Sequence, residues 1–150
     1  MKTTLLFLAT TASVFAQTKI TFDEGATLPA EWKSGITGGG DANWEVVRDA
    51  DAPSAPHVLK QSGEATFCWA AKTSLRVKGM TSGYGLDAKV AKNKWNVLRV
   101  DFAGALLTVS LNGSKLFDVE DTTMQGAGAV GVWTKADSVT LFDDFTYGNN

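Results

Sequence analysis

Hydrophobic and polar residues alternate along short stretches of this chain, and no long stretch repeats its hydrophobic residues at a helical period. Leu98, Val100 and Phe102, for example, are separated by charged residues. Successive side chains of a β-strand point to opposite faces, so this alternation predicts strands. The predicted strands are an opening one around 20–23 and then 44–48, 57–61, 66–71, 75–78, 95–102, 105–111, 115–119, 129–133 and 139–145. Short strands at this spacing are typical of an all-β, antiparallel β-sandwich.

Turn-forming residues mark the connections between these strands. The glycine-rich stretch 35–40 is predicted to be a turn region, and 49–56 a loop, because Pro53 and Pro56 lack the N–H group that a strand ladder needs. Asn112 and Gly113 stand between two alternating runs and predict a hairpin.

The length of this hairpin loop decides which side chains share a face. An odd-length loop places Leu107 and Val109 on the same face as Phe117 and Val119, whereas a strict two-residue turn separates them. We therefore expect a three-residue loop with a glycine bulge.

Residues 1–16 have the pattern of a signal peptide. Lys2 is followed by an apolar stretch that runs to Phe15, with residues of modest size before a cleavage site near Ala16. The sequence thus predicts a secreted or periplasmic protein with one domain over residues 17–150. No other stretch is apolar for long enough to cross a membrane, so no membrane partner is expected.

Charge and cysteine content exclude several function classes. Without Lys2, thirteen basic and sixteen acidic residues leave a net charge of −3, which argues against a nucleic-acid partner. Cys68 is the only cysteine, so an intramolecular disulfide is impossible and a cysteine-based zinc site is not expected. A buried, small hydrophobic side chain is the expected role of Cys68.

Several stretches together resemble a known family, the bacterial exported group called the 3-keto-disaccharide hydrolase or laminin-G/concanavalin-like glucanase domain. The resemblance covers most of residues 19–148 and implies a concanavalin-like jelly-roll that acts on saccharides. Its most specific part is Gly128–Asp137 followed by Phe142–Phe145. The other matching stretches are 22–24, 28–32, 44–47, 52–59, 93–100 and 111–115.

The chain departs from this family between about residues 79 and 90. Members of the family continue there through central strands that carry a Trp-Arg, a Tyr-Tyr with an arginine, and a Glu-Asp-Asn-type turn. Here the chain passes from Gly79 through residues 80–86 almost directly to Val90–Asn93, and Tyr84 is the one candidate remnant. The resemblance therefore implies a shortened jelly-roll in which part of the sugar-binding face is missing.

Flat aromatic rings can stack on the C–H faces of sugars, so the tryptophans are candidate binding residues. Trp44 and Trp95 alternate within predicted strands and are expected to be core residues. Trp69 and Trp133 are as well suited to a sugar platform as to the core, and Trp133 precedes a polar loop. The candidate saccharide-binding residues are Trp69, Tyr84, Trp133, Lys135 and Asp137.

Candidate catalytic residues follow from the chemistry of 3-keto-glucosides. A ketone at C3 acidifies the C2 proton, so a base and an electrophile suffice to eject the C1 substituent. His57 or Glu45 is the candidate base, and Lys135 or a metal the candidate electrophile; a surface position fits His57 equally well. A conventional retaining glucanase is disfavoured because its acid–x–acid–x–x–acid motif is absent, and Asp118 with Glu120 fits a solvated strand end.

Carboxylates near the two ends of the domain suggest a structural Ca²⁺ site. The opening and closing strands of jelly-rolls commonly pair, which would bring Asp23 and Glu24 near Asp143 and Asp144. Carboxylate oxygens are the ligands that Ca²⁺ prefers. The alternative is a pair of acidic strand ends that keep the sheet edges soluble.

The sequence therefore predicts an exported, carbohydrate-active protein with a saccharide partner. The first hypothesis is a hydrolase acting on 3-keto-glucosides or related saccharides. A non-catalytic carbohydrate-binding module is the second, and a shortened family member with a vestigial site, or an imperfect gene model, is the third.

Overall fold

A computed structural model describes residues 17–64, 67–71, 88–122, 128–135 and 138–149, and all its regular structure is β-strand. Every strand pairing in these residues is antiparallel, which confirms the all-β, sandwich-like fold. None of the described residues forms a helix that could cross a membrane. The predicted signal peptide, the predicted strand 75–78, most of the shortened central region, Tyr84 and Asp137 lie outside the described residues.

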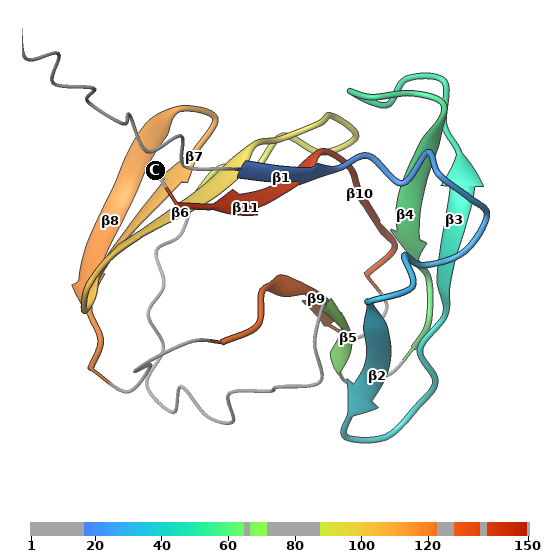
Figure 1. The fold of residues 1–150 in the computed structure, drawn as a ribbon, viewed down its shortest axis with the longest axis horizontal. Coiled ribbons are helices and arrows are strands. Elements are labelled where there is room, and N and C mark those ends of the chain that lie inside the picture. The colour runs from blue at the N-terminus through green and yellow to red at the C-terminus, as the bar shows by residue number, and fades with distance from the viewer. Residues whose placement is uncertain (1–16, 65–66, 72–87, 123–127, 136–137, 150) are drawn as a thin grey trace, which may run out of the picture.

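Three three-stranded sheets and one two-stranded sheet make up the described fold. In Figure 1 the β6–β7–β8 sheet lies on the left, the β10–β4–β3 sheet on the right, and the β1–β11 pair runs between them above β2–β5–β9. The strands are β1 Gln17–Ile20, β2 Lys33–Thr37, β3 Trp44–Arg48, β4 His57–Gln61, β5 Phe67–Ala71, β6 Leu98–Ala103, β7 Leu106–Leu111, β8 Ser114–Glu120, β9 Gly131–Lys135, β10 Thr140–Phe142 and β11 Phe145–Gly148.

The bounds of β3 and β4 are those that the alternation predicts, and the predicted pairing of the opening and closing strands is confirmed by β1 and β11. Three predictions need correction. The opening strand ends at Ile20, because Phe22 adopts a positive φ of 63° that no strand accommodates. The predicted final strand is two strands, β10 and β11, interrupted at Asp144 with a φ of 52°. Lys33–Thr37 was expected to lead into turns and instead forms β2.

In the hairpin between β7 and β8, the side chains lie on the predicted faces, but a bulge rather than a three-residue loop places them there. Leu111 pairs with Ser114, so the loop is the two residues Asn112 and Gly113, both with positive φ, and the predicted three-residue loop is wrong. The register shifts by one residue beyond Val109, where β8 carries a bulge. This bulge restores the expected alignment, because Leu107 then pairs with Val119 and Val109 with Phe117.

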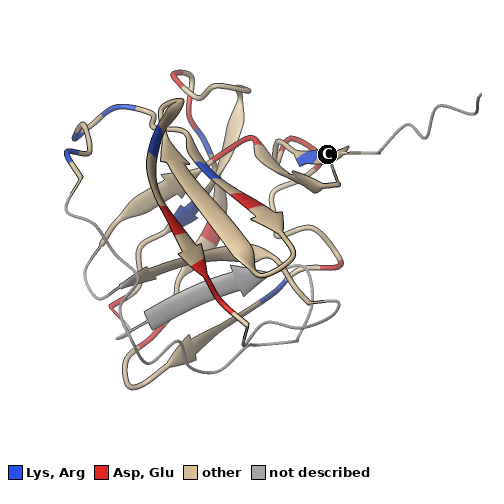
Figure 2. Ribbon diagram, turned by 90° about the vertical axis from the view of Figure 1, so that its left-hand side faces the viewer, with Lys and Arg blue, Asp and Glu red and all other residues tan. Residues whose placement is uncertain are grey.

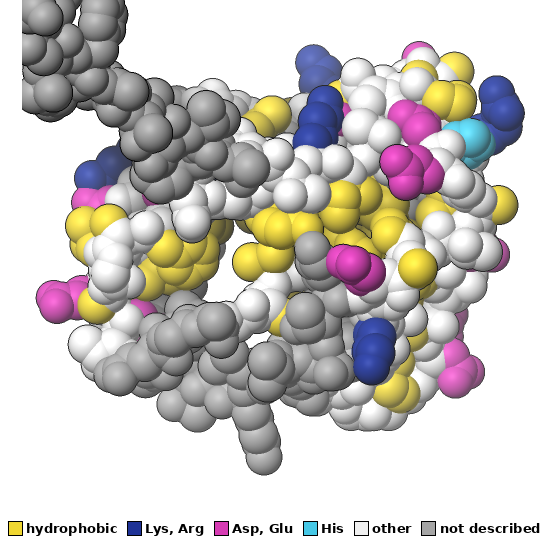
Figure 3. Space-filling view, viewed as in Figure 1, with side chains coloured by type: hydrophobic (Ala, Val, Ile, Leu, Met, Phe, Trp, Pro, Cys, Tyr) yellow, Lys and Arg dark blue, Asp and Glu magenta, His cyan; other side chains and the backbone are white. Residues whose placement is uncertain are grey.

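The β6–β7–β8 sheet has one charged and one apolar face. Figure 2 shows basic and acidic residues on the strands nearest the viewer, where Arg99 pairs with Asp101 and Lys115 with Asp118. Hydrophobic side chains gather on the side that faces the middle of the molecule (Figure 3). Phe102 pairs with the buried Leu107 but is itself 60% exposed, so this apolar face is only partly covered.

The hydrophobic core lies between the β1–β11 pair and the β10–β4–β3 sheet. Phe22, Trp32 and Leu59 form its buried centre. Trp32 meets Phe22 and Phe145 edge to face, with ring centroids 5.8 and 5.2 Å apart. Such edge-to-face pairs add about 0.5–1.5 kcal/mol each to the burial of their rings. The partly buried residues packed around this centre are Ile20, Leu28, Trp44, Val46, Val132, Phe142 and Phe145.

A buried polar pair joins the β10–β4–β3 sheet to the β2–β5–β9 sheet. Gln61 at the end of β4 is fully buried, accepts a hydrogen bond from Thr134 Oγ1 at 2.9 Å and donates one to the Gly63 carbonyl at 3.1 Å. Gly63 leaves no room for a side chain, because a Cβ atom there would lie 2.2 Å from the Asp41 carbonyl oxygen. The hydrogen bond between Thr134 and Gln61 fixes which face of β9 points toward the core.

Candidate functional site

The two faces of strand β9 differ in exposure. On β9, Val132 packs against the core and Thr134 is buried, whereas the intervening Trp133 is 62% exposed. Residues at alternate positions occupy the same face of a strand. The face that holds Val132 and Thr134 is therefore the inner face, and the face that holds Trp133 is the outer face.

Strand register places the two candidate sugar-stacking tryptophans side by side on the outer face. Trp133 on β9 pairs directly with Trp69 on β5, and Trp69 pairs on its other side with Gly35 on β2. Directly paired residues share a face, and neighbouring strands lie about 4.8 Å apart. We call Gly35, Trp69 and Trp133 the aromatic row. Two indole-bearing positions are thus adjacent, and the third position carries no side chain that could stand above them.

The other outer-face positions of this sheet flank the aromatic row. Phe67 and Lys135 are paired with each other beyond one side of the row, and Lys33 lies at the opposite end of β2. Lys135, which the sequence made both a candidate electrophile and a binding residue, is thus on the same face as Trp133 by register. Cys68 is paired with the buried Thr134 and takes an inner-face position.

His57 lies away from the aromatic row, at the start of β4. Its backbone N–H donates a hydrogen bond to Asp23 Oδ1 at 3.1 Å. Its Nδ1 atom is buried, makes no hydrogen bond to any described residue, and lies 3.5 Å from the same carboxylate oxygen. Asp23 therefore holds the histidine in place, and the imidazole side chain is 24% exposed.

The structure does not bring the three candidate catalytic residues into one site. Glu45 pairs with Lys60 and His57 with Arg48, so Glu45 and His57 lie three register positions apart on opposite faces of the β10–β4–β3 sheet. Lys135 belongs to the outer face of a different sheet. Of the candidate bases, His57 is the one with a carboxylate oxygen of another residue 3.5 Å from a ring nitrogen.

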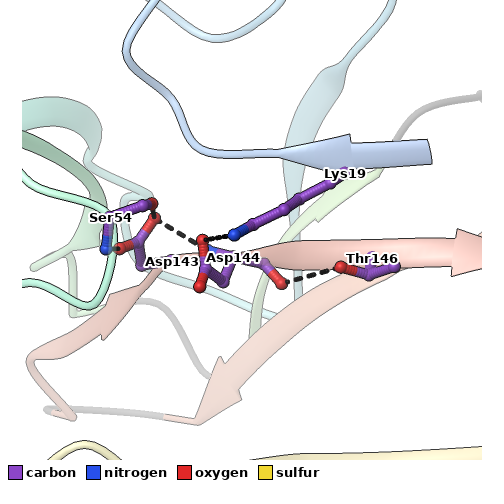
Figure 4. Close-up of polar contacts among 5 residues, drawn as sticks. All are labelled: Lys19, Ser54, Asp143, Asp144 and Thr146. Carbon is purple, nitrogen blue, oxygen red and sulfur yellow. Dashed lines mark hydrogen bonds and ion pairs between the residues drawn. The ribbon is translucent and has the colours of Figure 1, made fainter.

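The acidic residues between β10 and β11 contact the loop before β4 and the first strand (Figure 4). Asp143 accepts hydrogen bonds from the Ser54 N–H at 2.7 Å, the Ser54 hydroxyl at 2.6 Å and the Asp144 N–H at 2.7 Å. Asp144 Oδ1 lies 2.8 Å from Lys19 Nζ, and Thr146 Oγ1 donates to the Asp144 carbonyl at 3.2 Å. We call Ser54, Asp143, Asp144 and Lys19 the carboxylate latch.

The latch stabilises the charged form of Asp144. Burial alone favours the neutral carboxyl group, but hydrogen bonds from Lys19 and Ser54 and the charge of Lys19 outweigh burial and lower its pKa from the ordinary value. No three His, Cys, Asp or Glu side chains within the described ranges converge as metal ligands. The candidate calcium ligands are thus held by other groups: Asp23 accepts a hydrogen bond from His57, Asp143 accepts from Ser54, and Asp144 is paired with Lys19.

A cavity of about 410 Å³ lies along β1 and the segment that follows it. Its lining runs from Thr18 to Ala30 and includes Lys19 and Glu24 as its charged residues. With one carboxylate and no histidine in this lining, the cavity does not supply the pair of groups that a glycosidase needs.

Sequence reasoning missed the residues that complete these arrangements. Gly35 looked like part of a turn, and Lys33 was not considered, because β2 was not predicted. Ser54 and Lys19 gave no signal of their own, since their partners in the latch are far away in the sequence. Comparison with protein-family models, curated proteins and solved structures finds no match for this chain. The family resemblance carried by the sequence motifs stays a prediction.

Proposed function

We propose that this protein binds saccharides through the aromatic row. The observation that carries the proposal is the direct pairing of Trp69 with Trp133 on a face where Trp133 is 62% exposed. The same strand places Val132 and Thr134 inward, so the exposed tryptophan is not a core residue displaced by a poor fit. A large exposed aromatic surface marks a binding site more often than it serves stability. Sugar C–H faces are its natural complement because they are flat and apolar.

We also propose that the fold is a concanavalin-like jelly-roll and that the protein is exported. Pairing of the opening strand β1 with the closing strand β11 is what a concanavalin-like jelly-roll requires, and it supports that topology. Export through the signal peptide 1–16 would bring the domain 17–150 to extracellular saccharides. In this reading the chain is a shortened member of the 3-keto-disaccharide hydrolase group that retains a binding face.

Binding is tested with the purified domain 17–150 and soluble glucan oligosaccharides by isothermal titration calorimetry. Trp133→Ala is expected to weaken binding at least fivefold, which corresponds to about 1 kcal/mol. Phe102→Ala is the matched control, because Phe102 is 60% exposed and lies on another sheet. Equal losses in both variants, or no binding by the folded parent protein to any saccharide in a broad panel, would rule out the aromatic row as a sugar site.

A second function, cleavage of 3-keto-glucosides, is favoured by the contact between Asp23 and His57. In this scheme His57 takes the C2 proton, the bond between C1 and the leaving oxygen breaks, and that oxygen is protonated. Water then adds across the C1–C2 double bond, with its oxygen to C1 and a proton to C2, so the net reaction is hydrolysis. Asp23 would orient the imidazole, since its carboxylate lies 3.5 Å from Nδ1.

Sugar release from a 3-keto-glucoside tests this second function. His57→Gln is expected to abolish release, and Asp23→Asn to reduce it while leaving the fold intact by circular dichroism. Lys60→Ala, a substitution on the same strand as His57, serves as the control. Unchanged release in His57→Gln, or no release by the parent protein, would leave binding as the function.

A further inference from the structure

The outer face of the β2–β5–β9 sheet forms a regular grid of nine positions around Trp69. Trp69 is at its centre, with Gly35 and Trp133 beside it across the strands and Phe67 and Ala71 beside it along β5. Lys33 and Lys135 stand at opposite corners. The remaining corners are Thr37 and Gly131.

This grid is basic, although the chain as a whole is acidic. Its nine positions hold two lysines and neither an aspartate nor a glutamate, whereas the full chain has a net charge of −2. Lys33 is exposed. The β6–β7–β8 sheet differs, since it mixes both signs on its polar face in Figure 2.

The two lysine positions are separated by a distance that suits a chain of sugars. They are two strands apart and four residues apart along the strand direction. With neighbouring strands about 4.8 Å apart and a rise of about 3.4 Å per residue, the corners are about 17 Å from each other. The diagonal between them crosses the Trp69 position, so one extended oligosaccharide laid along it would pass both lysine positions and the aromatic row.

We propose that the aromatic row selects an acidic saccharide, a chain that contains uronic acids. This inference rests on the proposed saccharide binding and names its ligand class. The carboxylate of a uronic acid projects from the edge of the pyranose ring and leaves the ring faces free to stack on indole. The two lysines then meet the carboxylates at the ends of the bound segment. The net negative charge of the chain and the small number of basic positions disfavour a nucleic acid as the anionic ligand.

Exposed lysine–carboxylate pairs contribute little each and are screened by salt. Two such pairs should favour an acidic oligosaccharide over a neutral one by about tenfold in dissociation constant at low ionic strength. The preference should fall toward unity in 0.5 M NaCl, where the screening length is only a few ångströms. Stacking on the tryptophans should persist at both salt concentrations.

The test measures binding of the domain 17–150 to oligogalacturonate, to a neutral gluco-oligosaccharide of equal length and to oligothymidylate, each at 20 mM and 500 mM NaCl. The parent protein should prefer oligogalacturonate about tenfold at low salt. The double substitution Lys33→Ala with Lys135→Ala should remove that preference and leave binding of the neutral sugar unchanged. Lys92→Ala, an exposed lysine outside the sheet, should change neither.

The outcomes separate this inference from the one it rests on. Equal binding of acidic and neutral sugars, both lost in Trp133→Ala, would overturn the uronic-acid inference and leave saccharide binding standing. A low-salt preference for oligogalacturonate that survives in the double variant would also overturn it. Tighter binding of oligothymidylate than of either sugar, or no binding of any ligand, would overturn both proposals.

Discussion

Asp143 attaches the loop 49–56 to the segment between β10 and β11, and its replacement by asparagine tests how much this attachment stabilises the fold. Both carboxylate oxygens accept hydrogen bonds: Oδ2 from the Ser54 N–H, and Oδ1 from the Ser54 hydroxyl and the Asp144 N–H. An asparagine side chain has the same shape but only one acceptor oxygen, because its other terminal group is an NH₂ donor. Whichever way the amide is turned, its NH₂ group faces a backbone N–H.

The expected cost follows from these contacts. Asp143→Asn loses at least one hydrogen bond to a charged group, worth about 1.5–3 kcal/mol, and leaves a backbone donor opposed at a cost of about 1–3 kcal/mol. Both Asp143 and Ser54 are only partly buried, so we expect the lower half of the combined range, about 2.5–4 kcal/mol of unfolding free energy. Ser54→Ala removes the hydroxyl bond and keeps the backbone one, and should cost about 1–2 kcal/mol.

Urea denaturation at neutral pH measures these changes as shifts in the midpoint at an unchanged slope. Asp51→Asn is the matched control, because Asp51 is an exposed residue of the same loop. The predicted order of destabilisation is Asp143→Asn, then Ser54→Ala, then Asp51→Asn. If Asp143→Asn shifts the midpoint no more than the control does, the hydrogen bonds of Asp143 do not stabilise the fold. If Ser54→Ala costs as much as Asp143→Asn, the stabilisation comes from the Ser54 hydroxyl alone. The NH₂ group that faces a backbone N–H in Asp143→Asn would then add no cost.

Two further predictions concern packing and pH. Gly63→Ala should destabilise the domain by about 3 kcal/mol in thermal unfolding, because its Cβ would lie 2.2 and 2.6 Å from backbone atoms of Asp41 and Asn43. Gly25→Ala is the control: a Cβ there has nothing within 4 Å, so stability should change by less than about 0.5 kcal/mol. The lowered pKa of Asp144 means that its charged form stabilises the fold above the unfolded-state pKa of about 3.8, and that this contribution is lost as the pH falls through the lower folded-state pKa. Asparagine tolerates the positive φ of 52° at this position, so Asp144→Asn should keep the local backbone. The variant should have a lower free energy of unfolding at pH 7, and this free energy should fall less steeply below pH 4 than in the parent protein. An equally steep fall in both proteins would contradict the role of Asp144.

The alternation of hydrophobic and polar side chains correctly predicted those strands in which hydrophobic residues occupy one face. Val46 and Leu59 are examples, because each lies in a strand whose bounds the structure reproduces. Lys33–Thr37 was missed because Gly35 carries no side chain and disfavours a strand in isolation. Its strand is formed by pairing with β5, a tertiary contact with residues that come much later in the chain. The interruption at Asp144 was likewise invisible, since it depends on hydrogen bonds to residues from other segments.

Candidate site residues were predictable by type but not by arrangement. Trp69 and Trp133 could be named as sugar-stacking candidates from the chemistry of indole alone. Their direct pairing depends on the register of β5 against β9, which no local pattern specifies. For the same reason, Glu45 and His57 could be named together as candidate bases although their register positions lie on opposite faces of one sheet.

The position of Trp133 depends on a hydrogen bond between two residues outside the aromatic row. A shift of β9 by one residue would turn Trp133 inward and bring Val132 to the outer face. The hydrogen bond from Thr134 to the buried Gln61 opposes this shift, because a shifted strand would leave the amide of Gln61 without that donor in the core. Gln61 is in turn held by the Gly63 carbonyl, where a packed backbone leaves no space for a side chain. The outward direction of Trp133 is therefore set from inside the molecule, by a polar contact between the two sheets.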